Sequence, residues 1–184
     1  IGAAWYEKEA KGYGIPYPGT SERFEMLEDN LQLAKELWAS EESSFEGKHF
    51  SAPKITNNPP PLSQPHPRIM IGGMGPKKTL RMVAQYADAC NIFVYMPPED
   101  LARKLAVLKE HCDNLGRDYD SIDKTALGQV NLGEGGMTPA ELIEQCRGLA
   151  KIGFDTFIFS IANVEDLQHI ETIGREVIPA VAEL

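Results

Sequence analysis

The sequence lacks both long apolar runs and an excess of positive charge. No apolar run approaches the roughly 20 residues that a membrane-spanning helix needs. The 18 Lys and Arg residues are outnumbered by 27 Asp and Glu residues, which gives a formal net charge of −9. Negative charge opposes binding to nucleic acid and to acidic membrane surfaces. We therefore expect small-molecule ligands, with no nucleic-acid or membrane partner.

Cysteine and histidine are few and scattered. Cys90, Cys112 and Cys146 lie far apart and form no CxxC pair, which argues against a secretory disulfide framework. They are expected to be reduced, buried thiols of a cytoplasmic protein. The four histidines show no metal-ligand spacing, so we predict no metal. A GxxxxGK[ST] loop and a Ser–His–Asp order are also missing, and the sequence nominates no catalytic residue.

What is present is typical of one globular domain. With 184 residues, 42% of them hydrophobic and 24% charged, the chain is long enough for a sizeable core. We predict a single domain over residues 1–184. Within it, residues 45–67 are expected to be an irregular connecting segment, because the run of prolines from Pro59 to Pro61 fits neither a helix interior nor a central strand.

The first part of the chain predicts a strand end and one long helix. Residues 1–5 are short and apolar with Gly2 inside, which is typical of the tail of a strand. After a loop rich in glycine and proline, apolar residues recur at steps of three or four and predict an amphipathic helix. The residues of this apolar stripe are Phe24, Leu27, Leu31, Ala34 and Trp38.

From residue 68 onward, apolar runs alternate with helical patterns. Thr138 and Glu141 form a capping-box pattern with Pro139 at the first helical position, and Pro179 should bend or end the last helix. The expected strands span residues 68–71, 90–95, 124–131 and 156–161, and the expected helices span residues 76–86, 98–115, 138–152 and 164–182.

This alternation indicates a parallel sheet with right-handed crossovers. Two architectures remain open from the pattern: an open doubly wound sheet, and part of a (β/α)8 barrel, which usually takes about 250 residues. In both, ligands bind at the carboxyl ends of the strands. The functional surface should therefore consist of the loops that follow Trp5, Ile71, Tyr95, Asn131 and Ile161.

A glycine-rich turn between the first complete strand and its helix is the strongest motif. Glycines allow the backbone to approach a ligand closely, and a proline at the first helical position loses no useful donor. The N–H groups of the following residues, the Thr79 hydroxyl and the charges of Lys77 and Lys78 could hold a phosphate. The alternative is a tight turn that binds nothing.

Two further groups of residues lie at strand ends. Small residues followed by Trp5 and Tyr6 could let a flat ring lie against the backbone, or could be a packing cluster. Gln129 and Asn131 are neutral and polar at the end of the third complete strand, where they could bind a ligand or cap a loop.

Several segments, in this order, resemble the luciferase-like monooxygenase superfamily, and within it the branch of F420 (deazaflavin)-dependent oxidoreductases. They are IGAAWYEKEAKGYGIPYP, SERFEMLEDNLQLAKELW, FEGKHF, NNPPPLSQPHPRIMIGGMGPKKTLRMVAQYADACNIF and GRDYDSI. The resemblance implies a partial (β/α)8 TIM barrel, the C-terminal portion. Residues 1–5 would be the end of strand four, followed by strands five to eight with their helices.

The implied activity is hydride transfer between F420 and an organic substrate, with FMN-dependent monooxygenation as the alternative. A second alternative is an isolated half-barrel that has no activity and self-associates; a homo-oligomer is expected. Ala3 stands where sugar-phosphate dehydrogenases of the family carry a glutamate, which argues against a sugar phosphate as substrate. The resemblance implies these cofactor-binding residues: Gly2, Ala3, Ala4, Tyr6, Gly72, Gly73, Met74, Gly75, Pro76 and Thr79.

Overall fold

The computed structural model describes residues 1–182 and 184. The chain forms two compact units, residues 1–71 and 72–184, and each is described by itself. The single domain expected over the whole chain stays a prediction. Among the described residues, no helix is both long and apolar enough to cross a membrane.

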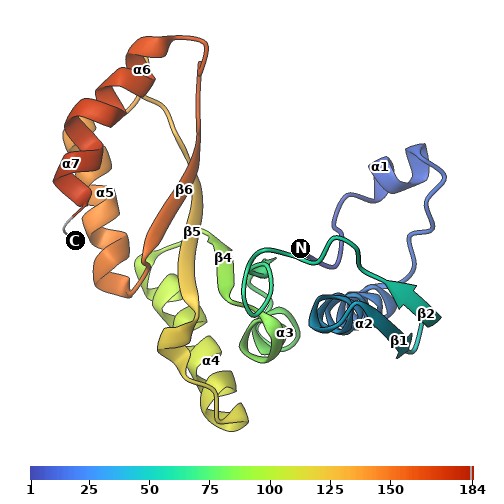
Figure 1. The fold of residues 1–184 in the computed structure, drawn as a ribbon. Coiled ribbons are helices and arrows are strands. Elements are labelled where there is room, and N and C mark those ends of the chain that lie inside the picture. The colour runs from blue at the N-terminus through green and yellow to red at the C-terminus, as the bar shows by residue number, and fades with distance from the viewer. Residues whose placement is uncertain (183) are drawn as a thin grey trace. The chain divides into compact units, whose positions relative to one another are not determined.

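The first unit is built around one long helix. Figure 1 shows helix α2 (Thr20–Ala39) beside a two-stranded antiparallel hairpin, β1 (Glu42–Glu46) and β2 (Ser51–Thr56), while the short helix α1 (Glu7–Gly12) precedes it. Leu27 and Leu31 of the expected apolar stripe are buried, which confirms the amphipathic helix.

One expectation for this unit is wrong, and another holds for only part of its range. Residues 1–5 form no strand: Ala4 has a φ of 58°, which breaks the extended conformation that strand pairing requires. In residues 45–67 the hairpin occupies the first part, whereas residues 57–67 form no helix or strand, as expected. Pro53 is accommodated in the hairpin because it lies where the register shifts, so its missing N–H interrupts no regular pairing.

The turn of the hairpin is held on α2 by a buried carboxylate. Asp29 Oδ2 accepts hydrogen bonds from the backbone N–H of His49 at 2.6 Å and of Phe50 at 3.3 Å. A Cβ on Gly47 would come within 2.6 Å of the Asp29 carboxylate, so only glycine permits this approach. Burial by itself works to raise the pKa of Asp29, but the backbone hydrogen bonds of His49, Lys48 and Phe50 outweigh it and hold the pKa below its ordinary value.

The second unit carries the parallel sheet. Its strands run in the order β3 (Met70–Gly72, which begins at the end of the first unit), β4 (Ala89–Phe93), β5 (Asp123–Val130) and β6 (Thr156–Ile161), and β4, β5 and β6 pair in parallel. This confirms the predicted α/β fold with a parallel sheet. The helical elements between and after the strands are α3 (Thr79–Tyr86), α4 (Pro98–Leu115), the 3₁₀ turn η1 (Tyr119–Ser121), α5 (Pro139–Ile152), α6 (Leu167–Thr172), the π-helical turn η2 (Ile173–Val177) and α7 (Ile178–Val181).

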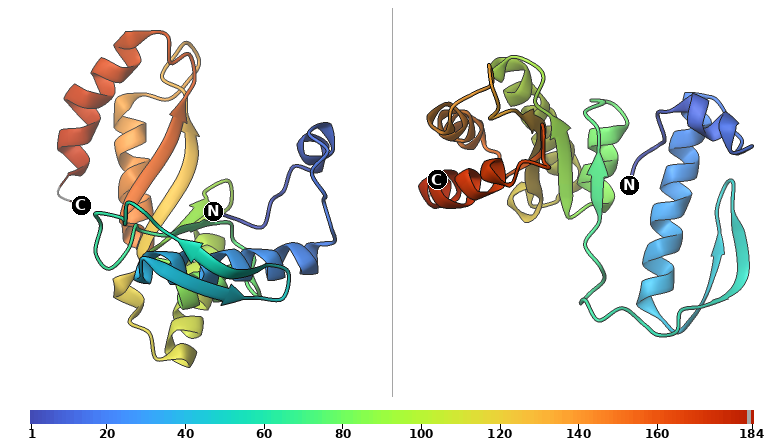
Figure 2. Two further views of the ribbon diagram at one scale, coloured as in Figure 1. Left: turned by 45° about the vertical axis from the view of Figure 1, so that its right-hand side comes forward. Right: turned by 90° about the horizontal axis from the view of Figure 1, so that it is seen from above.

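One face of the sheet packs against helices. Figure 2 shows α5 and the C-terminal helices on the same side of β5 and β6. Val130 of β5 and Leu142 of α5 are buried together with Ile173 and Val177 of the π-helical turn. Alternate residues of the strands therefore point toward this core, and the residues between them point toward the opposite face.

Local signals set most helix ends. At α5 the Thr138–Glu141 capping box is present, and Gly153 ends the helix with a φ of 110°. The last helix is interrupted by the π-helical turn just before Pro179, as the missing N–H of proline predicts. The expected start of α3 at Pro76 is wrong. Pro76 to Lys78 form a turn, and the N–H of Leu80 reaches back to Gly75 O at 3.0 Å, so the helix begins at Thr79.

We expect Asp29→Asn to lower the free energy of unfolding by about 2 kcal/mol, because it removes the charge from a buried carboxylate that accepts hydrogen bonds from the turn. Since the folded-state pKa of Asp29 is lowered, its contribution is present above the unfolded pKa and is lost as the pH falls through the folded one. Denaturant unfolding at neutral pH and below about pH 4 measures how much the free energy of unfolding falls on acidification. This fall should be smaller in the variant than in the wild type.

Glu36→Gln is the matched control, because it removes an exposed carboxylate from the same helix. An Asp29→Asn variant as stable as the control at neutral pH would contradict this role for the carboxylate.

Candidate functional site

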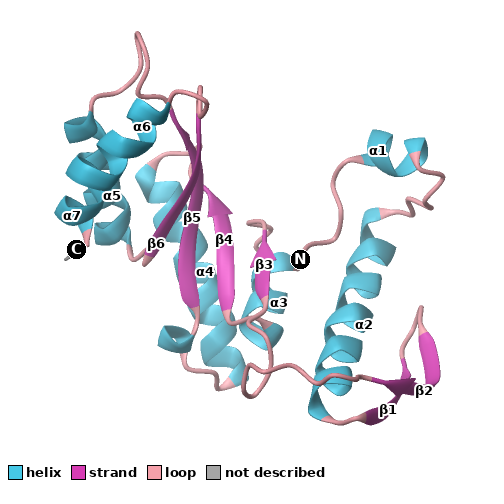
Figure 3. Cartoon of the chain, turned by 45° about the horizontal axis from the view of Figure 1, so that its top comes forward, coloured by secondary structure: helices cyan, strands magenta, loops and turns pink. Residues whose placement is uncertain are grey.

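The carboxyl ends of the four strands lie at the same edge of the sheet. Figure 3 shows the arrowheads of β3, β4, β5 and β6 pointing to this edge. The loops that follow the strands therefore gather there, at the edge where parallel α/β proteins generally bind ligands.

The glycine-rich loop after β3 closes around the side chain of Thr79. Gly73 has a φ of 119°, and its N–H donates to Asn91 O on β4 at 2.9 Å. This donor is therefore used by the sheet and is not available to a ligand. A Cβ on Gly75 would lie 2.9 Å from the Thr79 hydroxyl oxygen, so glycine leaves open the space beside that hydroxyl. Thr79 itself is 7% exposed.

The same loop is anchored from outside and carries positive charge. His111 Nε2 lies 2.8 Å from Pro76 O, which ties the end of the loop to α4. Gly72, Gly75 and Pro76 are exposed, Met74 is half-buried, and the neighbouring Lys77 and Lys78 are exposed. A fixed backbone turn, an adjacent hydroxyl and two lysines are together suited to holding an anion such as a phosphate.

The N-terminal candidates belong to the first unit. The Ala3 carbonyl accepts a hydrogen bond from Arg23 Nε at 3.0 Å, and the same guanidinium donates to Pro18 O at 2.6 Å and lies over the Tyr17 ring. Arg23, which the sequence did not single out, thus holds the segment on α2. Gly2 and Ala4 are exposed.

The aromatic side chains that follow this segment are also exposed. Trp5 and Tyr6 stack with their ring centroids 5.3 Å apart, and Trp5 is 86% exposed. A packing cluster would bury these rings, so Trp5 and Tyr6 do not form one within the first unit. They remain available as a wall for a flat ring.

The face of the sheet opposite the helices carries side chains in rows. Phe93, Leu127 and Ile158 stand in register across β4, β5 and β6, and one row further toward the carboxyl edge Gln129 stands beside Ser160. Phe93 and Ile158 are 41% and 38% exposed. Layers of side chains from neighbouring strands are the packing that fills the interior of a (β/α)8 barrel.

A cleft of about 730 Å³ opens where β5 and β6 end. Its walls come from the last residues of both strands and from the loop after β5: Gln129, Val130, Asn131, Gly135, Gly136, Met137, Ser160, Ile161 and Ala162. The sequence had suggested Gln129 and Asn131 as ligand contacts. The sequence did not predict Ser160, because a single serine in an apolar strand has no distinguishing pattern. Only the strand register shows that it lies beside Gln129.

Asn131 holds the loop that borders this cleft through two hydrogen bonds. Its side-chain oxygen accepts from the N–H of Gly133 at 2.9 Å, and its carbonyl accepts from the N–H of Met137 at 2.8 Å. A Cβ on Gly136 would lie 2.3 Å from that carbonyl oxygen, so the loop can fold back only with glycine there. The sequence left open whether Asn131 binds a ligand or caps a loop, and its side-chain hydrogen bond supports loop capping. Gln129 lines the cleft.

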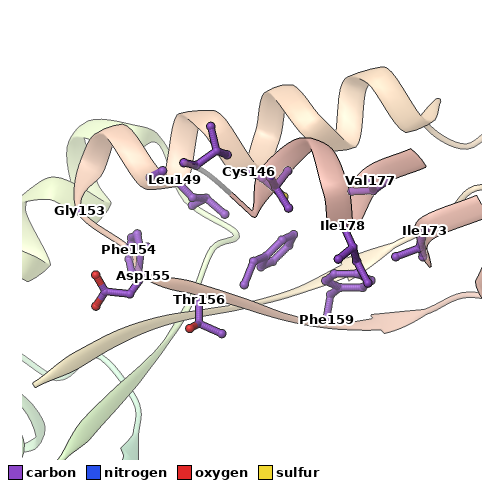
Figure 4. A pocket seen from close by; sticks show the side chains of 14 residues that line it. Cys146, Leu149, Gly153, Phe154, Asp155, Thr156, Phe159, Ile173, Val177 and Ile178 are labelled. Carbon is purple, nitrogen blue, oxygen red and sulfur yellow. The ribbon is translucent and has the colours of Figure 1, made fainter. Parts of the chain in front are cut away.

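A second cavity, of about 550 Å³, lies on the helix side of the sheet. Figure 4 shows its lining of mostly apolar side chains, among them Cys146, Leu149, Phe159 and Ile178 from α5, β6 and the C-terminal helices. Asp155 and Thr156 place it toward the amino end of β6, away from the loops that gather at the carboxyl edge.

None of the three cysteines is an activated nucleophile. Burial raises the pKa of the Cys90 thiol to about 11, and it also raises the pKa of Cys112 and Cys146. A raised pKa leaves little thiolate at neutral pH. All three thiols are free, with Cys90 and Cys112 buried and Cys146 half-buried. The described residues hold no group of three or more His, Cys, Asp or Glu side chains that could bind a metal ion.

Parallel β/α units whose loops gather at the carboxyl edge are typical of (β/α)8 barrels, and solved barrels share the fold of this chain, which is consistent with part of such a barrel. Residues 1–135 match the family described as luciferase-like monooxygenase, and the chain belongs to that family.

Its relatives include enzymes with different cofactors. An F420-dependent glucose-6-phosphate dehydrogenase of Nakamurella multipartita is 32% identical over 111 residues, which are 60% of this chain and 32% of that protein. An FMNH₂-dependent dimethylsulfone monooxygenase of Pseudomonas putida is 31% identical over 71 residues, 39% of this chain and 20% of that protein. The matched stretches thus span a third or less of these relatives.

Among solved structures, an F420-dependent secondary alcohol dehydrogenase in complex with an F420-acetone adduct superposes with a TM-score of 0.82. It is 18% identical, and the match covers 98% of this chain and 68% of the other. At this identity the likeness shows the fold alone.

Proposed function

We propose that the protein to which this chain belongs is an F420-dependent oxidoreductase that transfers a hydride between the deazaflavin and an organic substrate. The observation that carries the proposal is the open turn around Thr79, flanked by Lys77 and Lys78, in a chain of the luciferase-like family. F420-dependent enzymes among its relatives support the same cofactor.

The residues of the second unit fit the phosphate of such a cofactor. The space that a Cβ on Gly75 would fill lies beside the Thr79 hydroxyl, which could donate to a phosphate oxygen. Gly72, Gly73, Met74, Gly75 and Pro76 would supply close backbone approach, and Gly73 would act through its conformation because its N–H is already bonded to Asn91. Gly2, Ala3, Ala4 and Tyr6 of the first unit are proposed to lie beside the ring system.

In this proposal the protein contributes placement. Bound F420 would supply the hydride chemistry, and the chain would contribute remote binding energy at the phosphate without touching the reacting atoms. The walls formed by the strand ends would orient the substrate and keep water from the reacting carbon. Ala3, in place of the acid of the sugar-phosphate dehydrogenases, favours a substrate other than a sugar phosphate.

The alternative within the family is an FMN-dependent monooxygenase. The similarity to the dimethylsulfone monooxygenase supports it, and a phosphate turn is equally compatible with FMN. We expect the whole protein, after purification, to bind F420 tightly in a fluorescence titration and to retain no FMN. A yellow preparation that releases FMN on denaturation would support the monooxygenase instead.

Gly75→Val in the whole protein should raise the dissociation constant for its cofactor by at least roughly tenfold. The valine side chain would occupy the space beside Thr79, and a hydrogen bond to a charged group contributes about 1.5–3 kcal/mol. The cofactor titration measures this directly.

Gly148→Ala serves as the control, because a Cβ there meets nothing within 4 Å and α5 favours alanine. Unchanged affinity in a folded Gly75→Val protein would mean that the loop is a turn with no ligand.

The 184 residues by themselves are proposed to be inactive and to self-associate. Phe93 and Ile158 are exposed on the sheet face opposite the helices, and exposed apolar faces promote association. Sedimentation and turnover assays on the isolated chain should show oligomers without activity. A monodisperse monomer that turns over substrate would refute this. We also propose that the protein acts in the cytoplasm.

A further inference from the structure

We propose that the cleft between the ends of β5 and β6 receives an uncharged substrate with a carbonyl or hydroxyl group, held by Gln129 and Ser160, and rejects anionic ones. The inference names the substrate class for the oxidoreductase proposed above, and therefore rests on that function.

The lining of the cleft is neutral, and its polar side chains are those of Gln129, Asn131 and Ser160. Gln129 and Ser160 are exposed and stand in register on neighbouring strands, so their side chains point to the same face of the sheet. The amide can donate and accept hydrogen bonds, and so can the hydroxyl. Among the described residues that line the cleft, none carries a charged side chain. A charged substrate group would lose its hydration there without gaining an ionic partner.

The start of the helix that follows β5 is capped by a carboxylate of the chain itself. The backbone N–H and the hydroxyl of Thr138 both donate to Glu141 Oε2, at 2.7 and 2.9 Å, and the N–H of Glu141 donates to Thr138 Oγ1 at 3.2 Å. These bonds use donors that an anion would otherwise find at a helix N-terminus. They also hold the pKa of Glu141 below its ordinary value, so the carboxylate stays ionised and repels a second negative charge.

The loop after β6 adds to this negative rim. Asp166 caps α6 by accepting from the N–H of Gln168 at 3.0 Å, and Glu134 and Glu165 are exposed on the two loops. His169 faces the loop after β5, since a Cβ on Gly133 would lie 3.8 Å from its Nε2, and the Asp166 carboxylate stands 3.8 Å from the same nitrogen. The two loops and the helix start thus carry four carboxylates, counting Glu141, and one histidine, which lies next to Asp166.

The two ends of the carboxyl edge therefore differ in charge. The turn after β3 carries Lys77 and Lys78 and suits a phosphate, whereas the loops after β5 and β6 carry carboxylates around a neutral cleft. A substrate bound in this cleft would be selected by hydrogen bonding, and an anionic analogue would meet repulsion and an unpaired charge.

Methyl pyruvate and pyruvate test the inference, because both carry a ketone and they differ in one negative charge. Saturation-transfer NMR on the whole protein without F420 should show that the ester binds at least about tenfold more tightly than the acid. Gln129→Arg should reverse this preference, since a guanidinium pairs with a carboxylate through two hydrogen bonds. Gln129→Leu should weaken the ester by about tenfold through loss of its hydrogen bond.

Glu110→Gln is the matched control: it changes the net charge by the same amount as Gln129→Arg, but on the exposed side of α4. It should leave the preference for the ester intact. Thermal melting checks the fold of each variant, and Ser160→Arg replaces Gln129→Arg if the latter does not fold.

Equal binding of acid and ester to the wild type, no binding of either, or a preference unchanged by arginine would overturn the inference. Failure of the protein to bind F420 would sink the proposed function but would leave this measurement valid, because it needs no cofactor.

Discussion

Parallel pairing of β4, β5 and β6 is the constraint on which the rest of the second unit depends. After each strand the chain must return to the opposite end of the sheet before the next parallel strand can begin. A helix therefore follows every strand, and every strand-to-helix loop lies at the carboxyl edge. The same register sets side chains from neighbouring strands in rows. Gln129 and Ser160 meet for this reason, although they are far apart in the chain, on either side of α5.

The loops at this edge are held in place by hydrogen bonds, several of them to residues distant in the sequence. Gly73 is bonded to β4, Pro76 to His111, and the loop after β5 folds around Asn131. Glycine is required where another backbone or side chain approaches closely, at Gly75 beside Thr79 and at Gly136 beside Asn131. A preformed loop loses little conformational freedom when a ligand binds.

Much of the fold could be predicted from local patterns. The alternation of apolar runs and helical stripes indicated the parallel α/β unit, and the Thr138–Glu141 capping box and Gly153 marked the ends of α5. The hairpin of β1 and β2 was missed because its stability comes from a contact distant in sequence, the Asp29 carboxylate on the turn at His49 and Phe50. Such contacts leave no periodic signal.

In the candidate site, too, local features could be predicted from the sequence, whereas contacts between distant residues could not. By itself, the sequence determined the position and glycine content of the turn after β3, the lysines beside it and the segments that resemble the luciferase-like family, because these properties reside in neighbouring residues. The tertiary structure alone decided that the Gly73 N–H is already used, that Asn131 caps a loop, and that Gln129 and Ser160 share a neutral cleft. The physical reason is that hydrogen-bond partners and strand register are set by packing between distant segments.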